Sequence, residues 1–436
     1  MRVLIVGSGG REHCLAWKLA RSPRIDQIYV APGNGGTAWE GKPGQLASSE
    51  NVAIEATDMS GLVAFARNSG IDLTVVGPEA PLVEGMVDVF AAAGLRVFGP
   101  TRAAAQLEGS KAFAKRFMLE HGIPTGRAEI LDRYSAALDC LRQMGAPIVV
   151  KASGLAAGKG VMVCATLDEA EQALRTTMVE RAFGDAGNEV LIEEKLDGQE
   201  ASLLAFCDGH TVVPMVPAQD HKAVYDGDRG PNTGGMGCYA PARLMTPELI
   251  AQVMREVLQP TVDGMRALGT PYVGVLYAGL MITDQGPRVL EFNCRFGDPE
   301  AQVILPLLQT DLVNVIEACV EGRLPHVGVR WQDASAACVV LASGGYPGRY
   351  ERGRTVVGLQ EAAGLDNVFA FHAGTGREGK RVVTSGGRVL GITAVGPTLA
   401  CVLERAYAAV ERVHFEGIHY RRDIGAKGLA ADPGNG

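Results

Sequence analysis

The stretch LEFNCR, residues 290–295, carries side chains whose types and spacing suit a metal ion and a neighbouring anion. Glu291 and Asn293 lie two residues apart on a predicted strand, so their side chains project from one face. A carboxylate and an amide carbonyl are oxygen ligands that suit Mg²⁺ already holding phosphates and water. Arg295 continues this face with a planar fork for a carboxylate or phosphate. Taken alone, a Glu and an Arg on one strand face more often form a solvated ion pair.

A second stretch, KASGLAAGKGV at residues 151–161, has the composition of a loop that wraps a phosphate. It is not a P-loop, because Gly154 and Gly158 are too close together and Gly160, instead of a serine or threonine, follows Lys159. The flanking runs PIVV and VMVC predict a strand on each side and hence a hairpin. Such a hairpin can cover the phosphates of a nucleotide with its backbone N–H groups. An ordinary glycine-rich hairpin explains this stretch, by itself, about equally well.

The N-terminal sequence predicts a third anion site. RVLIVGSGGREH gives a buried strand, glycines at positions 7, 9 and 10, and the start of a helix. The pattern argues against a dinucleotide site, because Glu12 stands where that fingerprint needs glycine and the second strand leads to Asn34 without an acidic residue. Glycines at a strand end, followed by a helix N-terminus, still favour a simpler phosphate. The alternative is that these glycines only serve tight turns.

The elements that must position these residues follow from the periodicity of the chain. Strands alternate with helical segments over the first hundred residues, which predicts a parallel βαβ sheet. Helices are also expected at four later places: 108–124, 137–145, 167–178 and 398–413. The segment 219–241, rich in Gly, Pro and Asn, indicates a long ordered loop with a function. Further strands are predicted within 189–206, 277–302 and from about residue 334 onwards.

Bulk composition limits the classes of function. The chain has 436 residues, 47% of them hydrophobic and 21% charged, as in globular proteins, and its length predicts roughly two to four domains. A net charge of −8 without a long basic run argues against nucleic acid as the main partner. Nine cysteines without a C-x-x-C pair indicate reduced thiols. Neither a signal-peptide pattern nor an apolar run near the ~20 residues of a membrane span is found, so we expect a cytoplasmic protein without a membrane partner.

Six motifs together resemble the ATP-grasp superfamily: GSKAFAKRF, KASGLAAGKGV, IEEKLDGQEAS, QDHK, GPNTGGMG and EFNCRFGDPE. Within it the chain is similar to the phosphoribosylamine–glycine ligase, or glycinamide ribonucleotide synthetase, family. This likeness runs from GSGGREH and APGN near the start to HAGT and GGRVL near the end. GPNTGGMG and EFNCRFGDPE are specific to that family, whereas the glycine flap is not. The resemblance implies a multidomain α/β and α+β protein, with an ATP-grasp fold, an N-terminal parallel, Rossmann-like α/β domain and a small C-terminal domain.

The resemblance also implies an activity, that of an ADP-forming ligase of purine biosynthesis. ATP would phosphorylate glycine, and the amine of 5-phosphoribosylamine would attack the glycyl phosphate to give glycinamide ribonucleotide, ADP and phosphate. Mg²⁺ or Mn²⁺ would be the metal. Both steps need charge neutralisation and positioning more than a protein nucleophile, and the sequence offers no evident Ser–His or Cys–His pair. A monomer, or at most a weak dimer, is expected.

Residue by residue, the resemblance implies an ATP site, a metal site and sites for two substrates. Lys111 and Lys151 would contact phosphates. Glu193, Glu194 and Leu196 would contact the adenine, and Glu200 the ribose. The whole ATP site would comprise Lys111, Lys151, Gly154, Gly158, Lys159, Gly160, Glu193, Glu194, Leu196 and Glu200. The metal ligands would be Glu291 and Asn293, and the catalytic residues Arg295 and Lys151. The substrates would contact Gly9, Gly10, Arg11, Glu12, Asn34, Asp220, Lys222, Asn232, Thr233, Gly234, Gly235 and Arg295. Of these, Gly9 to Glu12 and Asn34 would hold phosphoribosylamine, whereas Arg295 and the GPNTGGMG loop would hold glycine and its acyl phosphate.

The expected domains are 1–108, 109–333 with an inserted flap subdomain at about 128–198, and 334–436. Two positions depart from the family pattern: Ser153 stands where the family has an aspartate, and Ala223 where it has a basic residue. Two other functions remain open. An ATP-grasp carboxylase or ligase with another acid substrate is disfavoured by GPNTGGMG. A nucleotide-sensing module without turnover is disfavoured by the intact lysines and the Glu–Asn pair.

Overall fold

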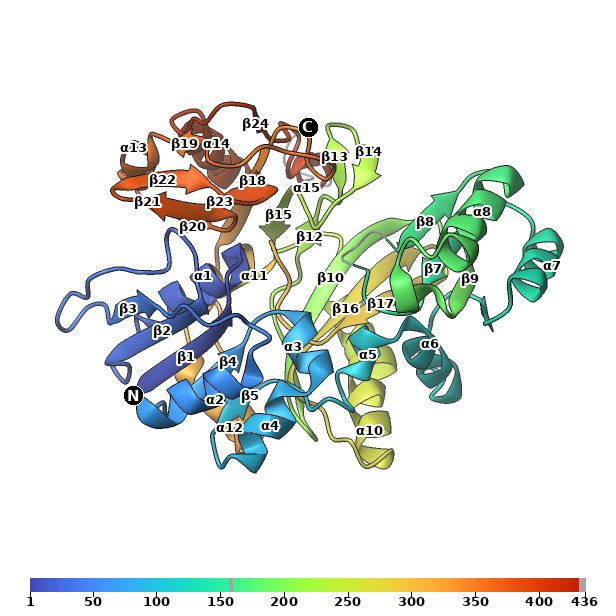
Figure 1. Cartoon of the computed structure of the whole chain (residues 1–436), viewed down its shortest axis with the longest axis horizontal. Coiled ribbons are helices and arrows are strands. Elements are labelled where there is room, and N and C mark those ends of the chain that lie inside the picture. Colours follow the sequence, from blue (N-terminus) through green and yellow to red (C-terminus); the bar gives the residue numbers. More distant parts are fainter. Residues whose placement is uncertain (157–159, 431–436) are drawn as a thin grey trace.

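The computed structural model describes residues 1–156 and 160–430, and its first sheet is parallel throughout (Figure 1). Its strands lie in the order β3-β2-β1-β4-β5. Their bounds are β1 (Arg2–Gly7), β2 (Gln27–Pro32), β3 (Ser48–Asn51), β4 (Leu73–Val76) and β5 (Val97–Phe98). The intervening helices are α1 (Gly10–Leu19), α2 (Met59–Asn68), α3 (Glu79–Glu84) and α4 (Met86–Ala92). Buried Val, Ile and Leu runs in β1 and β4 fit strands covered on both faces, and the predicted parallel sheet is confirmed.

The central sheet is antiparallel, in the order β11-β10-β16-β17. Its strands are β10 (Gln199–Asp208), β11 (Val212–Pro214), β16 (Val273–Thr283) and β17 (Gly286–Asn293). One apolar cluster, which includes Phe117, Met265 and Leu280, packs this sheet against nearby helices. The helices of this region are α5 (Gln106–Gly109), α6 (Lys111–Glu120), α9 (Pro247–Val253), α10 (Gln259–Ala267), α11 (Ala301–Leu307) and α12 (Leu312–Val320).

Two expectations for this region are wrong in detail. The single helix expected at 108–124 is broken, because Ser110 adopts an extended backbone and its side chain accepts a hydrogen bond from the N–H of Phe113, which begins α6. Arg295 does not lie on the strand with Glu291, because β17 ends at Asn293. The chain turns after that residue, so alternation along the strand no longer decides where Arg295 points.

A separate four-stranded sheet, the flap sheet, extends away from the rest of the molecule on the right of Figure 1. Its order is β6-β9-β7-β8, with bounds β6 (Ala128–Leu131), β7 (Ile148–Ala152), β8 (Val161–Cys164) and β9 (Val190–Glu194). Helices α7 (Tyr134–Met144) and α8 (Leu167–Leu174) share its small apolar core with Val150 and Ile192. Because β7 and β8 pair antiparallel, the hairpin predicted around the glycine-rich stretch is confirmed.

The C-terminal sheet recruits strands from the segment predicted to be a long loop. It runs β12-β15-β18-β23-β20, and β24 pairs with β18. Four short strands lie within 219–241: β12 (Gln219–Asp220), β13 (Ala223–Tyr225), β14 (Arg229–Asn232) and β15 (Gly237–Ala240). The prediction that 219–241 is one long loop is therefore wrong, because these strands interrupt it. Strands of two to four residues rich in Gly and Pro have no usable alternation, and β15 is stabilised by a partner, β18, about a hundred residues later.

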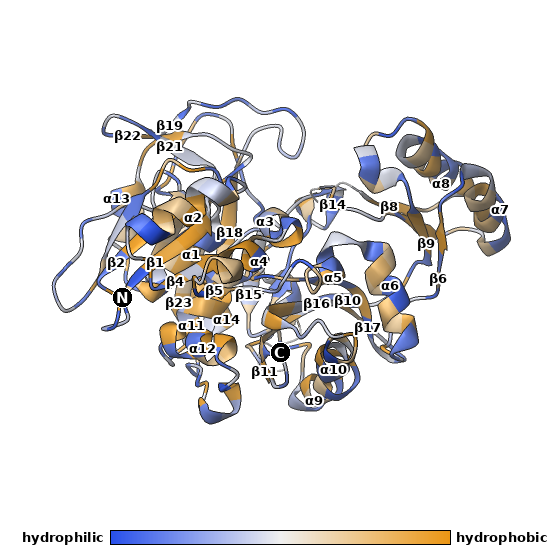
Figure 2. Ribbon diagram, turned by 60° about the horizontal axis from the view of Figure 1, so that its bottom comes forward, coloured by the Kyte–Doolittle hydropathy of each residue, from blue (hydrophilic) through white to orange (hydrophobic). Residues whose placement is uncertain are grey.

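The remaining elements complete this C-terminal region. They are β18 (Ser335–Ser343), β19 (Thr355–Val356), α13 (Leu359–Ala363), β20 (Val368–His372), β21 (Thr375–Glu378), β22 (Arg381–Thr384), β23 (Arg388–Gly396), α14 (Leu399–Val410), β24 (Ile418–His419) and α15 (Ala426–Ala430). Apolar residues gather along the inner strands and the inner helix faces (Figure 2). Within residues 1–156 and 160–430, no helix is both long and apolar enough to cross a bilayer.

Candidate active site

A cavity of about 660 Å³, the main cavity, lies where the four sheets meet. It is lined by the β1–α1 turn, α6, strands of the flap sheet, the end of β17 and residues around β12 to β14. Most of the predicted site residues line it: Gly9, Arg11, Glu12, Lys111, Lys151, Gly160, Glu193, Asp220, Lys222, Thr233, Gly234, Glu291, Asn293 and Arg295. The cavity therefore brings together residues from all six motifs.

Other predicted residues do not line the main cavity in the part of the chain that the structure describes. These are Gly10, Asn34, Gly154, Glu194, Leu196, Glu200, Asn232 and Gly235. Glu194 accepts a hydrogen bond from the N–H of Arg127 at 2.8 Å, and Glu200 pairs with Lys222 at 2.8 Å. Gly158 and Lys159 lie outside the described residues.

The lysine of the flap sheet is fixed by a carboxylate from the neighbouring strand. Glu193 on β9 lies opposite Val149 on β7, so its side chain is diagonal to Lys151 on the same face. The Lys151 Nζ is 2.7 Å from one Glu193 oxygen and donates to the carbonyl of Leu290 at 3.1 Å. The second Glu193 oxygen is 3.3 Å from the Nζ of Lys115. The carboxylate expected at the adenine edge is thus engaged by two lysines.

Lys111, the second lysine predicted to contact phosphates, also lines the main cavity. Lys111 is the first residue of α6, and its Nζ donates to the carbonyl of Gly154 at 3.2 Å. Burial lowers the pKa of Lys111, and Glu291 opposes that shift. Two ammonium groups on separate elements therefore face one cavity, an arrangement that suits a polyphosphate.

Glu291 and Asn293 fit a metal site that relies on ligands from outside the protein. Burial acts to raise the pKa of Glu291, but Lys222, Lys151, Lys111 and Arg295 together hold it below its ordinary value near 4.5, so this carboxylate is ionised at neutral pH. The Oδ1 of Asn293 accepts a hydrogen bond from Arg295 at 3.1 Å. No cluster of three or more His, Cys, Asp or Glu suited to a metal occurs among the described residues. Two protein oxygens beside phosphates and water are what Mg²⁺ commonly uses.

Arg295 is held by two carboxylates that the sequence reasoning did not identify. Its Nη2 donates to Glu108 at 2.8 Å, and its Nε is 3.3 Å from an oxygen of Glu79. Burial acts to lower the pKa of Arg295, but Glu108 and then Glu79 raise it. The Nε has no hydrogen-bond partner among the described residues. Only part of this guanidinium is therefore available to a ligand. Nothing in the sequence indicated that Glu108, 187 residues before Arg295, would contact it.

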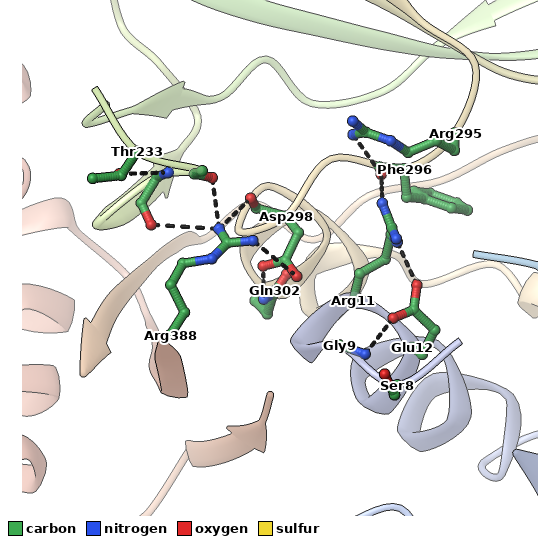
Figure 3. Close-up of polar contacts among 12 residues, drawn as sticks. Ser8, Gly9, Arg11, Glu12, Thr233, Arg295, Phe296, Asp298, Gln302 and Arg388 are labelled. Atoms are coloured by element: carbon green, nitrogen blue, oxygen red, sulfur yellow. Dashed lines mark hydrogen bonds and ion pairs between the residues drawn. The ribbon is translucent and has the colours of Figure 1, made fainter. Parts of the chain in front are cut away.

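The β1–α1 turn is built around Glu12 (Figure 3). This carboxylate is 1% exposed and accepts from the N–H of Gly9 and the Nε of Arg11. A Cβ on Gly7, which has φ of +126°, or on Gly77 would meet the Glu12 side chain at 2.6 and 2.1 Å, so these glycines make room for Glu12. The glutamate that breaks the dinucleotide fingerprint is thus the organising residue of the turn.

Asn34 links the N-terminal turn to the C-terminal sheet. Its amide donates to the carbonyls of Ser8 at 2.9 Å and His372 at 2.8 Å, and its oxygen accepts from Gly36. It lines a smaller side cavity of about 360 Å³, which shares Ser8, Gly9, Asp298, Tyr346 and Arg388 with the main cavity. Its side-chain hydrogen bonds therefore go to the protein backbone.

Lys222 and Asp220 line the main cavity, and the charge of Glu291 acts on Asp220. The carbonyl of Lys222 accepts from the hydroxyl and the N–H of Thr233, which fixes the start of the GGMG turn. Burial raises the pKa of Asp220 to about 7; Lys222 opposes the shift, and Glu300, Glu200 and Glu291 add to it. These residues form a group of ionisable side chains near Glu291.

Arg388 is the clearest residue that the sequence reasoning missed. It begins β23, lines both cavities, and its Nη1 donates to the carbonyls of Gly234 at 2.6 Å and Asp298 at 2.7 Å (Figure 3). GGRVL was noted as a family match, but nothing in that motif indicated that its arginine reaches the cavity. Other missed residues on the cavity wall are Glu79, Glu108, Lys115, Asp298, Glu300 and Tyr346.

Comparisons with known proteins agree with this arrangement. Three family models match the chain: the phosphoribosylglycinamide synthetase N domain at residues 1–108, its ATP-grasp (A) domain at 109–301 and its C domain at 336–427. Phosphoribosylamine–glycine ligase of Vibrio cholerae is 54% identical over 435 residues, 99% of both chains. That of Pseudomonas aeruginosa is 52% identical over 435 residues, 100% of both chains.

Solved structures give the same result for the fold. The crystal structure of phosphoribosylamine–glycine ligase from Thermotoga maritima is 33% identical, with a TM-score of 0.82, and the match covers 97% of this chain and 100% of that one. A biotin carboxylase domain from Hydrogenobacter thermophilus is similar in fold, with a TM-score of 0.72 at 17% identity over 96% of this chain and 91% of that one. The expected multidomain α/β architecture with an ATP-grasp domain is confirmed, and with it a family that uses ATP and a divalent metal. The chain belongs to the phosphoribosylglycinamide synthetase family.

Proposed function

We infer that this chain is an ATP-dependent ligase that joins glycine to 5-phosphoribosylamine, giving glycinamide ribonucleotide, ADP and phosphate in purine biosynthesis. The observation that carries this inference is that Lys111 of α6 and Lys151 of β7 line one cavity together with Glu291 and Asn293. Phosphoryl transfer to a carboxylate needs positive charge around the γ-phosphate and little else from the protein.

The proposed roles follow from where each group lies. Lys111 at the start of α6 and Lys151 on β7 would attract the phosphates of ATP. Glu291 and Asn293 would hold Mg²⁺ or Mn²⁺, which neutralises phosphate charge when it is bound. Arg295 and the Thr233–Gly234 turn would orient glycine, with Arg295 itself held by Glu79 and Glu108.

We also propose which substrate each part of the chain binds. Residues 1–108 would hold the phosphoribosylamine, chiefly through Gly9, Gly10, Arg11 and Glu12. Residues 109–333, with the flap subdomain at about 128–198, would hold ATP, metal and glycine, and 334–436 would close the cavity with Arg388. A monomeric, cytoplasmic enzyme that does not bind nucleic acid fits these roles.

The proposed intermediate is glycyl phosphate. A glycine carboxylate oxygen attacks the γ-phosphorus and ADP departs; the amine of phosphoribosylamine then attacks the acyl carbon, and phosphate departs with that glycine oxygen. Glycine labelled with ¹⁸O in its carboxylate should therefore deliver one labelled oxygen to inorganic phosphate per turnover. Unlabelled phosphate, or AMP among the products, would overturn the intermediate while leaving the ligase activity standing.

The activity itself is tested by ADP release. The purified chain should release ADP only when glycine, freshly made phosphoribosylamine, ATP and a divalent metal are all present. ADP release that does not depend on glycine but requires bicarbonate would instead support a carboxylase. Binding of nucleotide without turnover under any of these conditions would support a sensing module.

A further inference from the structure

Lys115 is a buried lysine of α6 at the joint between the central sheet and the flap sheet. Its side chain is 1% exposed, although it lines the main cavity. Its Nζ donates to the hydroxyl of Thr125 at 2.7 Å and to the carbonyl of Gly126 at 3.1 Å, and it lies 3.3 Å from Glu193. An ammonium group has three donors. All three therefore face protein oxygens, so Lys115 has no donor left for a ligand.

Glu193 lies between this lysine and the lysine of the flap sheet. One of its oxygens faces Lys115 and the other faces Lys151 at 2.7 Å, and none of the three side chains is more than 8% exposed. Lys151 uses one further donor on the carbonyl of Leu290, which leaves its third donor for a ligand. The two lysines therefore differ: all three donors of Lys115 face protein oxygens, whereas Lys151 keeps one donor for a ligand.

The charges of this triad add up to one positive charge. A Lys151–Glu193 pair alone would be neutral, and a neutral pair attracts an anion weakly because its field is that of a dipole. The buried ammonium of Lys115 gives the three side chains a net positive charge, although it is hardly exposed to solvent. Burial lowers the pKa of Lys115 below its ordinary value near 10.5, and Glu193 opposes this shift.

We propose that Lys115 is a positioning residue that offsets the charge of Glu193, so that Glu193 can orient Lys151 without cancelling its attraction for the phosphates of a nucleotide. This inference rests on the proposed use of ATP. It gives Glu193 a task different from contact with the adenine, and it separates recognition of phosphate from recognition of the base.

The test is equilibrium binding of ADP and of adenosine to the full chain by calorimetry. Lys115→Met should weaken ADP binding by about 10- to 100-fold, because the buried Glu193 then cancels the charge of Lys151. Adenosine, which has no phosphate, should bind within about twofold of the unchanged chain. Adding Glu193→Gln to Lys115→Met removes the charge that needed offsetting, so the double variant should recover at least about threefold in ADP affinity.

A matched control is Lys18→Met. Lys18 is a partly buried lysine of α1 that donates to the carbonyl of Leu308, away from the cavity. It should change neither affinity by more than about twofold. If Lys115→Met does not fold, Lys115→Gln carries the same expectations, because its amide can still donate to Thr125 or Gly126 without the charge.

Each outcome decides the proposal. Equal losses for ADP and adenosine would mean that Lys115 supports the packing of the site, and the proposal would be wrong. A double variant that binds ADP no better than Lys115→Met would refute the offset of charge. If the unchanged chain bound neither ADP nor adenosine, the proposed function would fail on its own, before any variant is compared.

Discussion

Replacing Lys151 with alanine tests the phosphate-binding role of the flap sheet. The contacts of Lys151 allow the expected loss of stability to be estimated separately from the expected loss of activity. Glu193 would keep its contact with Lys115, so it is not left without a partner, which would cost about 3–5 kcal/mol in a buried pair. The carbonyl of Leu290 would lose one donor, worth about 1 kcal/mol. We therefore expect a folded variant with a modest loss of stability.

The reaction should suffer more than the fold. A cation directed at phosphate charge inside an active-site cavity is worth several kcal/mol in the transition state. A loss of about 10²-fold in kcat/KM for ATP, or about 2.7 kcal/mol, is expected. The assay is coupled ADP release at saturating glycine and phosphoribosylamine, with thermal unfolding measured alongside.

Lys195→Ala is the matched control for this variant. Lys195 follows β9, is exposed and pairs with Asp197. Its removal should alter kcat/KM by less than about twofold. A change of under threefold in Lys151→Ala would take Lys151 out of the site, and a large loss accompanied by unfolding would show that the variant reports on the fold.

Three further outcomes are expected. Arg295→Lys should raise the KM for glycine more than that for ATP, because an ammonium cannot hold Glu79, Glu108 and a substrate carboxylate in the geometry of a guanidinium; a rise for ATP alone would assign Arg295 to the phosphates. Glu291→Gln should raise the Mg²⁺ concentration for half-maximal ADP release by about tenfold, since it removes the one ionised ligand; an unchanged midpoint would contradict that role. Burial, and then Arg421 and Lys427, lower the pKa of His221 to about 4. The folded state thus disfavours its protonated form, so its contribution to the free energy of unfolding is complete above pH 6.5 and is lost as the pH falls towards 4, up to about 3 kcal/mol. Urea unfolding at pH 7 and pH 5 should show a smaller pH dependence in His221→Asn, and an equal dependence in both chains would count against it.

Elements that are formed by residues close together in the sequence could be predicted from the sequence. The buried strand before Gly7 and the hairpin around Lys151 could be recognised because apolar runs and glycines lie within a few residues of each other. The Glu–Asn pair on β17 could be recognised because alternation places both on one face. Each of these features needs information from fewer than about fifteen residues of chain.

Features that depend on distant contacts could not be predicted in this way. Glu108 meets Arg295 across 187 residues, and it was assigned only to a helix. Lys115 has no unusual neighbours in the sequence, yet folding places it against Glu193. Strand β15 exists because β18 pairs with it, and Gly237 carries no propensity of its own for a strand. In each case the decisive partner is brought near only by the tertiary fold.

The partners of the cations explain why the site needs so many separate elements. A buried ammonium or guanidinium without a partner is costly, so a cavity rich in cations requires compensating carboxylates even before a ligand binds. Here each compensating acid comes from a different place: Lys151 pairs with Glu193, Arg295 with Glu79 and Glu108, Lys222 with Glu200, and Arg388 with Asp298. These acids also reduce the net positive charge of the cavity. A fully neutralised cavity would attract phosphate weakly. The second cation on Glu193 leaves an excess of positive charge in this group of side chains at the flap sheet, where the phosphates of ATP would lie. An excess of positive charge at this place suits a reaction that must hold a polyanion.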